Sequence, residues 1–227
     1  MITALVAAVA LTVSPARVDL VGAGTQMVRV TNTGTVAAVL DVTRAGFALD
    51  LHGRPRIVKA SAAWLAFTPR RLSVAAGHSA MLTVRTRVPR GLAPGDHPGL
   101  LLLTQHPLAT GGLAVRTRIG VVVSLRVPGR VVHRLVVSGV SVAGRVVRVS
   151  LINRGNVTEV LPPALVTVTL WRGQKLLARF HPAARELLPR ARGVFDLRYV
   201  GGRRPLSVRI AIHDSSKRPL VERSFTL

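Results

Sequence analysis

The chain has 227 residues, enough for one large domain or two of roughly 100 residues each. With 48% hydrophobic residues it is too apolar to be disordered, and each half can bury a core. Lys and Arg number 32 against 9 Asp and Glu, a net charge of +23. Cysteine is absent, which excludes disulfides, thiolate metal sites and a cysteine nucleophile.

The first ten residues, MITALVAAVA, are apolar and uncharged. This run has the length of the hydrophobic region of a secretory signal, and Ala8 and Ala10 provide an A-x-A-like cleavage site. No basic residue precedes it, so a first strand that begins early is the alternative. No later stretch is apolar for long enough to cross a membrane as a helix. We therefore expect residues 1–10 to be a signal peptide and the protein to be secreted or held in the cell envelope.

Short Val-rich runs with period-2 alternation follow, separated by Gly, Pro, Asn and Asp, and helical periodicity is nearly absent. The first half contains expected strands at 11–20, 26–31, 37–45, 64–68, 80–88, 99–105 and 113–127. The second half contains them at 132–137, 145–153, 165–171, 175–180, 193–200, 207–213 and 220–227. Seven strands in each half predict an all-β protein with two tandem immunoglobulin-like antiparallel β-sandwiches.

The boundary between the two sandwiches is expected at Val127-Pro128-Gly129-Arg130. Proline cannot donate to a strand ladder and glycine frees the backbone, so this tetrapeptide ends a strand and forms a linker. The predicted domains are 11–127 and 130–227.

An internal similarity supports duplication of one module. Residues 28–36 and 149–157 share a strand followed by Asn-x-Gly-x-Val. Asparagine caps its own turn and glycine adopts positive φ freely, so both stretches predict a tight turn after a strand.

Arginine dominates the positive charge, because only three of the 32 basic residues are lysine. Arg85 with Arg87, and Arg116 with Arg118, occupy alternate strand positions and should share a solvent-facing side. Such faces are either ordinary solvated surfaces that discourage aggregation or a binding surface for an anionic partner. Aromatic residues are only 4%, which makes base stacking on nucleic acid the weaker possibility. Trp64 and Trp171 are expected as core anchors of the two sandwiches.

The chain lacks patterns that catalysis or metal binding would use. None of its seven histidines has the i, i+2 or i, i+4 spacing of a metal-binding pair. Its nine carboxylates are never within three residues of one another, and neighbouring arginines should keep them ionised. We expect a non-enzymatic protein without cofactor or metal.

Several stretches of the first half occur in a familiar order: 13–20, 28–34, Trp64 to Pro69, Val74 to Gly77, and a strand that leads into Val88-Pro89 and Pro94-Gly95. This order resembles the N-terminal domain of periplasmic pilus chaperones. In its Trp, Pro, Gly, Val-Pro and Pro-Gly run it resembles more closely the WxL-interacting surface proteins of Gram-positive bacteria. The resemblance covers residues 11–127.

Pilus chaperones hold the terminal carboxylate of a subunit with a basic pair and lend an exposed strand to the subunit's sheet. The resemblance implies Arg17 as one member of that pair and Arg116 or Arg118 as the other. Two features depart from the chaperone pattern. The loop at residues 110–112 is short, and Arg116 and Arg118 interrupt the apolar run of the last strand.

We interpret the sequence as an exported, non-catalytic bacterial surface protein for binding or adhesion assembly, whose partner is a cell-wall polymer or another surface protein. The first alternative is a pilus-chaperone-like assembly factor that clamps a pilus-like subunit with Arg17 and Arg116 or Arg118. The second alternative is a basic nucleic-acid-binding protein.

Overall fold

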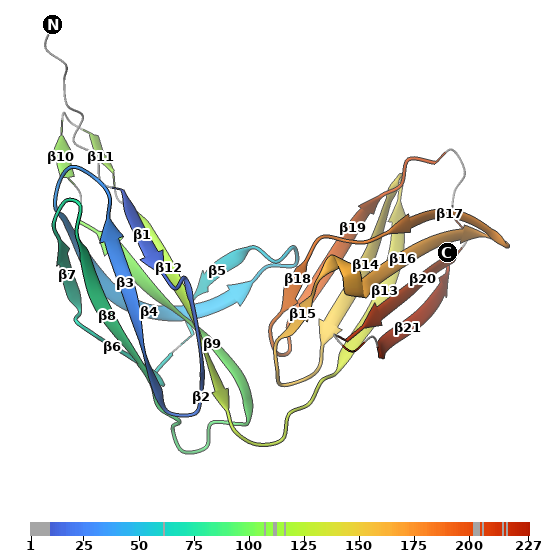
Figure 1. Ribbon diagram of the computed structural model, residues 1–227. Helices are drawn as coiled ribbons and strands as arrows, with labels where there is room; N and C mark the ends of the chain where they lie inside the picture. The colour runs from blue at the N-terminus through green and yellow to red at the C-terminus, as the bar shows by residue number, and fades with distance from the viewer. Residues whose placement is uncertain are drawn as a thin grey trace, which may run out of the picture. The chain divides into compact units, whose positions relative to one another are not determined.

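The computed structural model describes residues 10–227 except 61, 107, 111–112, 116, 202–204, 206, 215 and 217, with backbone only for the described part of 107–116. The described chain forms two compact units (Figure 1). The first contains residues up to Phe47 and Ile57–Gly129, and the second contains Ala48–Arg56 and Arg130–Leu227. The expected fold class, two tandem immunoglobulin-like β-sandwiches, is confirmed.

The first unit packs two sheets face to face. Sheet one has the order β1 (Leu11–Ser14), β3 (Gly24–Asn32), β8 (Ser79–Thr86) and β6 (Leu65–Thr68). Sheet two has the order β2 (Arg17–Val21), β12 (Arg118–Val127), β9 (Gly95–Gln105), β4 (Ala38–Leu49) and β5 (Pro55–Val58), with β7 (Arg71–Val74) also on β4. A separate hairpin joins β10 (Leu108–Thr110) to β11 (Leu113–Val115).

Two predictions for this unit were wrong, because each segment expected as one strand forms two separate strands. The strand expected at 11–20 breaks at Pro15: β1 pairs antiparallel with β3 in sheet one, whereas β2 pairs parallel with β12 in sheet two. Proline has no N–H to continue a ladder, so the chain changes sheet there. The strand expected at 113–127 is also divided, since β11 pairs with β10 and β12 begins only at Arg118.

The core of the first unit lies between its two sheets. Alternate residues of β12 and β9 face inward, and Val121, Leu101 and Leu103 are fully buried. Trp64 is 6% exposed and packs in this core, which confirms the role expected for it. The added strands β5 and β7 escaped sequence detection because four residues are too few to show a period.

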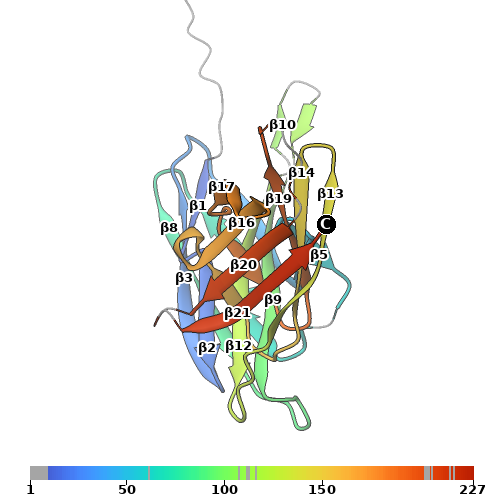
Figure 2. The ribbon, with the colours of Figure 1, turned by 90° about the vertical axis from the view of Figure 1, so that its right-hand side faces the viewer.

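The second unit has the same layered construction (Figure 2). Sheet three has the order β13 (Leu135–Ala143), β14 (Val146–Asn153) and β19 (Arg192–Arg198). Sheet four has the order β17 (Lys175–Phe180), β16 (Val166–Arg172), β20 (Ser207–His213) and β21 (Pro219–Thr226). A short pair, β15 (Glu159–Leu161) and β18 (Arg185–Leu187), and one 3-10 turn, η1 (Pro163–Leu165), complete the unit.

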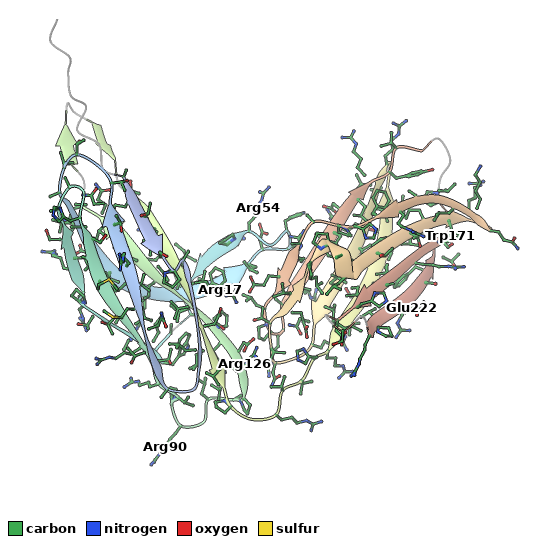
Figure 3. The ribbon with its side chains drawn as sticks, viewed as in Figure 1. Arg17, Arg54, Arg90, Arg126, Trp171 and Glu222 are labelled. Carbon is green, nitrogen blue, oxygen red and sulfur yellow. The ribbon has the colours of Figure 1, made fainter. Side chains whose placement is uncertain are left out.

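The structure corrects the role expected for Trp171. Val166, Val168 and Leu170 alternate into the core of the second unit, and a bulge follows between Leu170 and Trp171. Trp171 (Figure 3) is half-buried outside that core, and the Arg209 guanidinium lies 4.9 Å from its ring centroid. The alternation of side chains along the strand, and not the size of the side chain, therefore decides which residues enter the core. Trp171 makes a cation–π contact with Arg209 instead of anchoring the interior.

The Asn-x-Gly repeat performs the same structural task in both units. Asn32 and Asn153 are fully buried, and the side-chain oxygen of each accepts the amide N–H two residues ahead. The Nδ2 of Asn32 donates to the carbonyls of Val36 and Val74, at 2.8 and 3.1 Å. The Nδ2 of Asn153 donates to those of Val157, Leu187 and Leu188, at 2.7, 3.0 and 3.2 Å. Each asparagine thus ties its turn to a second segment of the sandwich.

The second repeat requires glycine at position 155 because a side chain there would collide with neighbouring backbone. Gly155 does not have the positive φ expected for it. Instead, a Cβ at Gly155 would lie within 3.0 Å of the backbone of both Val132 and Arg134. The linker is therefore packed against this turn, and the strand expected from residue 132 begins at Leu135.

Replacing Asn153 by Ala should destabilise the second unit by about 2–4 kcal/mol, because three carbonyls and one amide lose a buried partner. Urea unfolding followed by tryptophan fluorescence, with Trp171 as the reporter of this unit, measures the change. Arg154→Ala is the control, since that side chain is exposed beside the same turn. Equal stability of the two variants would contradict the role given to Asn153.

Candidate functional site

The parallel pairing of β2 with β12 places the predicted site residues. Arg17 lies opposite Val122 of β12, and Arg118 is four residues earlier on the same strand. Four residues of extended chain span about 13 Å, so the structure does not bring Arg17 and Arg118 side by side. Arg116 lies outside the described residues. The clamp of Arg17 with Arg116 or Arg118 stays a prediction.

Arg17 instead has a carboxylate neighbour on its own strand (Figure 3). Its Nε is 3.0 Å from both oxygens of Asp19, two residues away on the outer face of sheet two. Both side chains are open to solvent, at 41% exposed for Arg17 and 60% for Asp19. An exposed pair of this kind contributes little to stability and can exchange for another carboxylate.

A second basic side chain on this face was not found from the sequence. Arg126 lies opposite Val21 of β2, and its Nε and Nη2 donate to Asp96 of β9 at 2.6 and 2.9 Å. The Asp96 side chain is only 3% exposed, and its hydrogen bonds raise the pKa of Arg126. The cross-strand register that joins these residues 30 positions apart leaves no signal in the sequence.

One stretch of β12 forms an open sheet edge. β2 covers β12 only from Val122 to Arg126, and no described strand lies on that side of residues 118–121. The amide of Gln105 donates to the carbonyl of Thr117, and the amide of Val122 donates to that of Ala16. By the alternation of an antiparallel ladder, the N–H and C=O groups of Arg118 and Gly120 point to the open edge.

The sequence showed two departures from the chaperone pattern, a short loop and an interrupted apolar strand, and the structure gives a different description of each. The connection between β9 and β12 is longer than the three residues 110–112, because it contains the hairpin of β10 and β11. Arg118 does not break the apolar alternation of β12, since it lies on the outer face while Ile119 and Val121 lie on the inner face. β12 therefore presents alternating apolar residues next to its open edge.

Several other ionisable groups form pairs elsewhere in the two units. His106 and Arg71 contact the two oxygens of Asp41 at 2.6 and 3.0 Å, and His133 contacts Glu159 at 3.0 Å. The Arg71 hydrogen bond is the largest cause that lowers the pKa of Asp41. Across the described part of the chain, no three His, Asp or Glu side chains are grouped to hold a metal ion.

The arginines expected on solvent-facing strand positions are exposed where the structure describes them. Arg85 of β8 and Arg29 of β3 lie on the outer face of sheet one, and Arg87 follows the end of β8.

No helix within the described residues is long and apolar enough to cross a membrane.

No protein-family model matches the chain, and no curated protein sequence matches it. Solved structures match over both units. The class 5 fimbriae chaperone CfaA has a TM-score of 0.58 at 12% identity, with 96% of this chain and 98% of that chain covered.

Two chaperone complexes match similarly. The chaperone–tip adhesion subunit complex CsuC–CsuE from archaic chaperone-usher pili of Acinetobacter baumannii has a TM-score of 0.54 at 15% identity, covering 95% and 97% of the two chains. The Salmonella enterica SafA pilin in complex with the SafB chaperone has 0.53 at 13% identity, covering 96% of each chain. The chain therefore has the two-domain fold of the periplasmic pilus chaperones, and the resemblance to WxL-interacting proteins gains no support.

The pairing of Arg148 with Asp196 makes stability depend on acid pH. Arg148 donates to Asp196 at 2.6 and 2.9 Å, which lowers the pKa of this carboxyl to about 2. A depressed folded-state pKa stabilises the fold above the ordinary value of 3.8, and this contribution is lost as the pH falls toward about 2.

We therefore expect Arg148→Gln to lose less stability than the wild type between about pH 5 and pH 2. Urea unfolding at a series of pH values measures both slopes. Arg198→Gln, an exposed change on β19, should keep the wild-type slope. A wild-type slope in Arg148→Gln would show that the pair is not formed in solution.

Proposed function

We propose that this protein is an assembly chaperone for a pilus-like subunit in the bacterial envelope. The likeness to fimbrial chaperones across both units carries the proposal, because it includes complexes of such chaperones with a pilin and with a tip adhesion subunit. The chaperone class is non-enzymatic, in keeping with the catalytic patterns that the sequence lacks.

The open edge of β12 is where a subunit strand would add. Arg118 and Gly120 direct backbone groups toward that edge, and Ile119 and Val121 point inward on either side of Gly120. An exposed edge of this kind gains one hydrogen bond for each group that an added strand satisfies. The subunit would thereby complete its own sheet with residues 118–121.

Arg17 would bind a carboxylate of the subunit near the same edge. It lies opposite Val122, immediately after the open stretch, and half of its side chain is accessible. The guanidinium can form a bidentate pair with an incoming carboxylate once that group replaces Asp19. Arg118 would add a second positive charge at the far end of the open edge, without touching the same carboxylate.

The other functions considered from the sequence have less support. A wall polymer would need a continuous basic surface, whereas on the outer face of sheet two Arg17 lies beside the exposed Asp19 and Arg126 is paired with the buried Asp96. A nucleic-acid partner would need stacking platforms, and of the two tryptophans one is buried and the other is covered by Arg209.

The test of the proposed function is a complex with a subunit. The full chain purified from the envelope of its own cells should carry a stoichiometric partner whose fold lacks one strand. Arg17→Ala should weaken this complex about tenfold or more, since a charge-assisted pair is lost. Arg29→Ala, an exposed arginine on sheet one, is the matched control and should not weaken it.

The edge itself is tested by Gly120→Pro. The N–H of Gly120 points away from β9, so proline removes a donor from the open edge and no hydrogen bond of the β9–β12 ladder. A Cβ at this position would lie 3.2 Å from Leu100 Cδ1, the end of a side chain that can shift. We expect the purified variant to melt close to the wild type and to fail to hold the subunit. A complex that survives in both Gly120→Pro and Arg17→Ala would refute strand addition at this edge.

Asp19→Asn should have the opposite effect to Arg17→Ala. Replacing this competing carboxylate by a neutral amide weakens the internal contact of the Arg17 guanidinium, so the subunit complex should dissociate several times more slowly. Surface plasmon resonance with the isolated subunit measures the rate. Faster dissociation would show that Asp19 contributes to binding instead of competing with it.

A further inference from the structure

The opposite side of the first unit has a second open sheet edge, on β6. β6 is the last strand of sheet one and pairs only with β8 among the described strands. The amide of Arg87 donates to the carbonyl of Trp64 at 3.0 Å. This hydrogen bond shows which residues of β6 direct their backbone groups toward β8, because these residues alternate along an antiparallel pair. The backbone groups of Leu65 and Phe67 therefore point away from β8.

The outward backbone groups of Leu65 have hydrogen-bond partners within the described chain, whereas those of Phe67 do not. The carbonyl of Leu65 accepts a hydrogen bond from Nη1 of Arg44 at 2.9 Å, and its amide donates to the carbonyl of Ala62 at 2.9 Å. No described residue forms such bonds with the outward N–H and C=O of Phe67. One donor and one acceptor thus remain open in the middle of β6.

A cavity of about 570 Å³ opens beside Phe67, and its walls include Arg44 of β4 and Arg70 of the turn after β6. The amide of Val42 donates to the carbonyl of Arg70 at 2.8 Å, so the turn is held against β4. The cavity lies between the edges of the two sheets, where the chain passes from β6 to β7.

The cavity has uncompensated positive charge. Its one carboxylate, Asp41, has both oxygens occupied by Arg71 and His106. Neither Arg44 nor Arg70 forms an ion pair with a described carboxylate. Two arginines that have no described carboxylate partner therefore line the cavity together with Phe67 and the open strand edge.

We propose that this edge binds an extended acidic segment of a partner protein. The segment adds to β6 through the backbone of Phe67, and its carboxylates bind Arg44 and Arg70 on either side. Alternate side chains of a strand lie about 7 Å apart on one face, so acidic residues at i and i+2 can reach both arginines. This site is separate from the β12 edge and does not depend on the proposed function.

The probe is a blocked hexapeptide that alternates glutamate and valine, with a matched peptide in which glutamine replaces glutamate. Titration calorimetry with the full chain at low salt should detect the acidic peptide and not the neutral one. Arg44→Gln with Arg70→Gln should weaken binding about tenfold or more. Arg29→Gln with Arg85→Gln removes the same charge from the outer face of sheet one and should change affinity less than about threefold.

Two further readouts fix the mode and the place of binding. Amide exchange at Phe67 should slow when the peptide binds, since its free N–H gains a partner. Arg17→Ala should bind the peptide with wild-type affinity, so failure here and failure of the subunit complex are distinguishable. Arg70→Gln alone keeps the Arg44 contact to Leu65 and serves if the double variant does not fold.

Three results would overturn the proposal. Equal loss in the two double variants would mean that only net charge attracts the peptide. Loss in Arg44→Gln with Arg70→Gln without protection of Phe67 would mean a simple anion site with no strand addition. Loss in Arg17→Ala would place the peptide at the β12 edge.

Discussion

The hydrogen bonds of sheet edges constrain everything else in the first unit. The chain crosses from one sheet to the other after β1 and after β6, at Pro15 and Pro69, and each crossing leaves part of a neighbouring strand without a partner. One such place is residues 118–121 of β12, and the other is Phe67 of β6. Backbone groups left in this way are available for pairing with another chain, so the topology that closes the core also leaves two open strand edges.

Arginine side chains lie beside both open edges. Asp19, Asp41, Asp96 and Asp196, four of the chain's nine carboxylates, each accept hydrogen bonds from an arginine side chain. The net charge of +23 comes mainly from arginine, and Arg44 and Arg70, which form no ion pair with a described carboxylate, lie beside an open strand. Charge then favours acidic partners, while the backbone of the edge favours extended ones.

The two proposed binding edges differ in the contacts that their arginines already make within the chain. At β12, Arg17 already holds Asp19, so a partner must replace an internal carboxylate. At β6, Arg44 is held by the carbonyl of Leu65 and has no such competitor. The first arrangement favours a partner with a strongly bound carboxylate, and the second accepts acidic side chains of an added strand.

The amino-acid sequence determined the all-β class, the buried role of Trp64 and the position of both Asn-x-Gly turns, because alternation and turn residues are local. Strand order, the division of the expected strands at Pro15 and before Arg118, and the outward position of Trp171 came only from the tertiary structure. Arg17 was predicted from the resemblance to pilus chaperones, whereas nothing in the sequence singled out Arg126, Arg44 or Arg70. Their surroundings arise from pairing between segments far apart in the chain, and register of that kind is decided by packing and not by neighbouring residues.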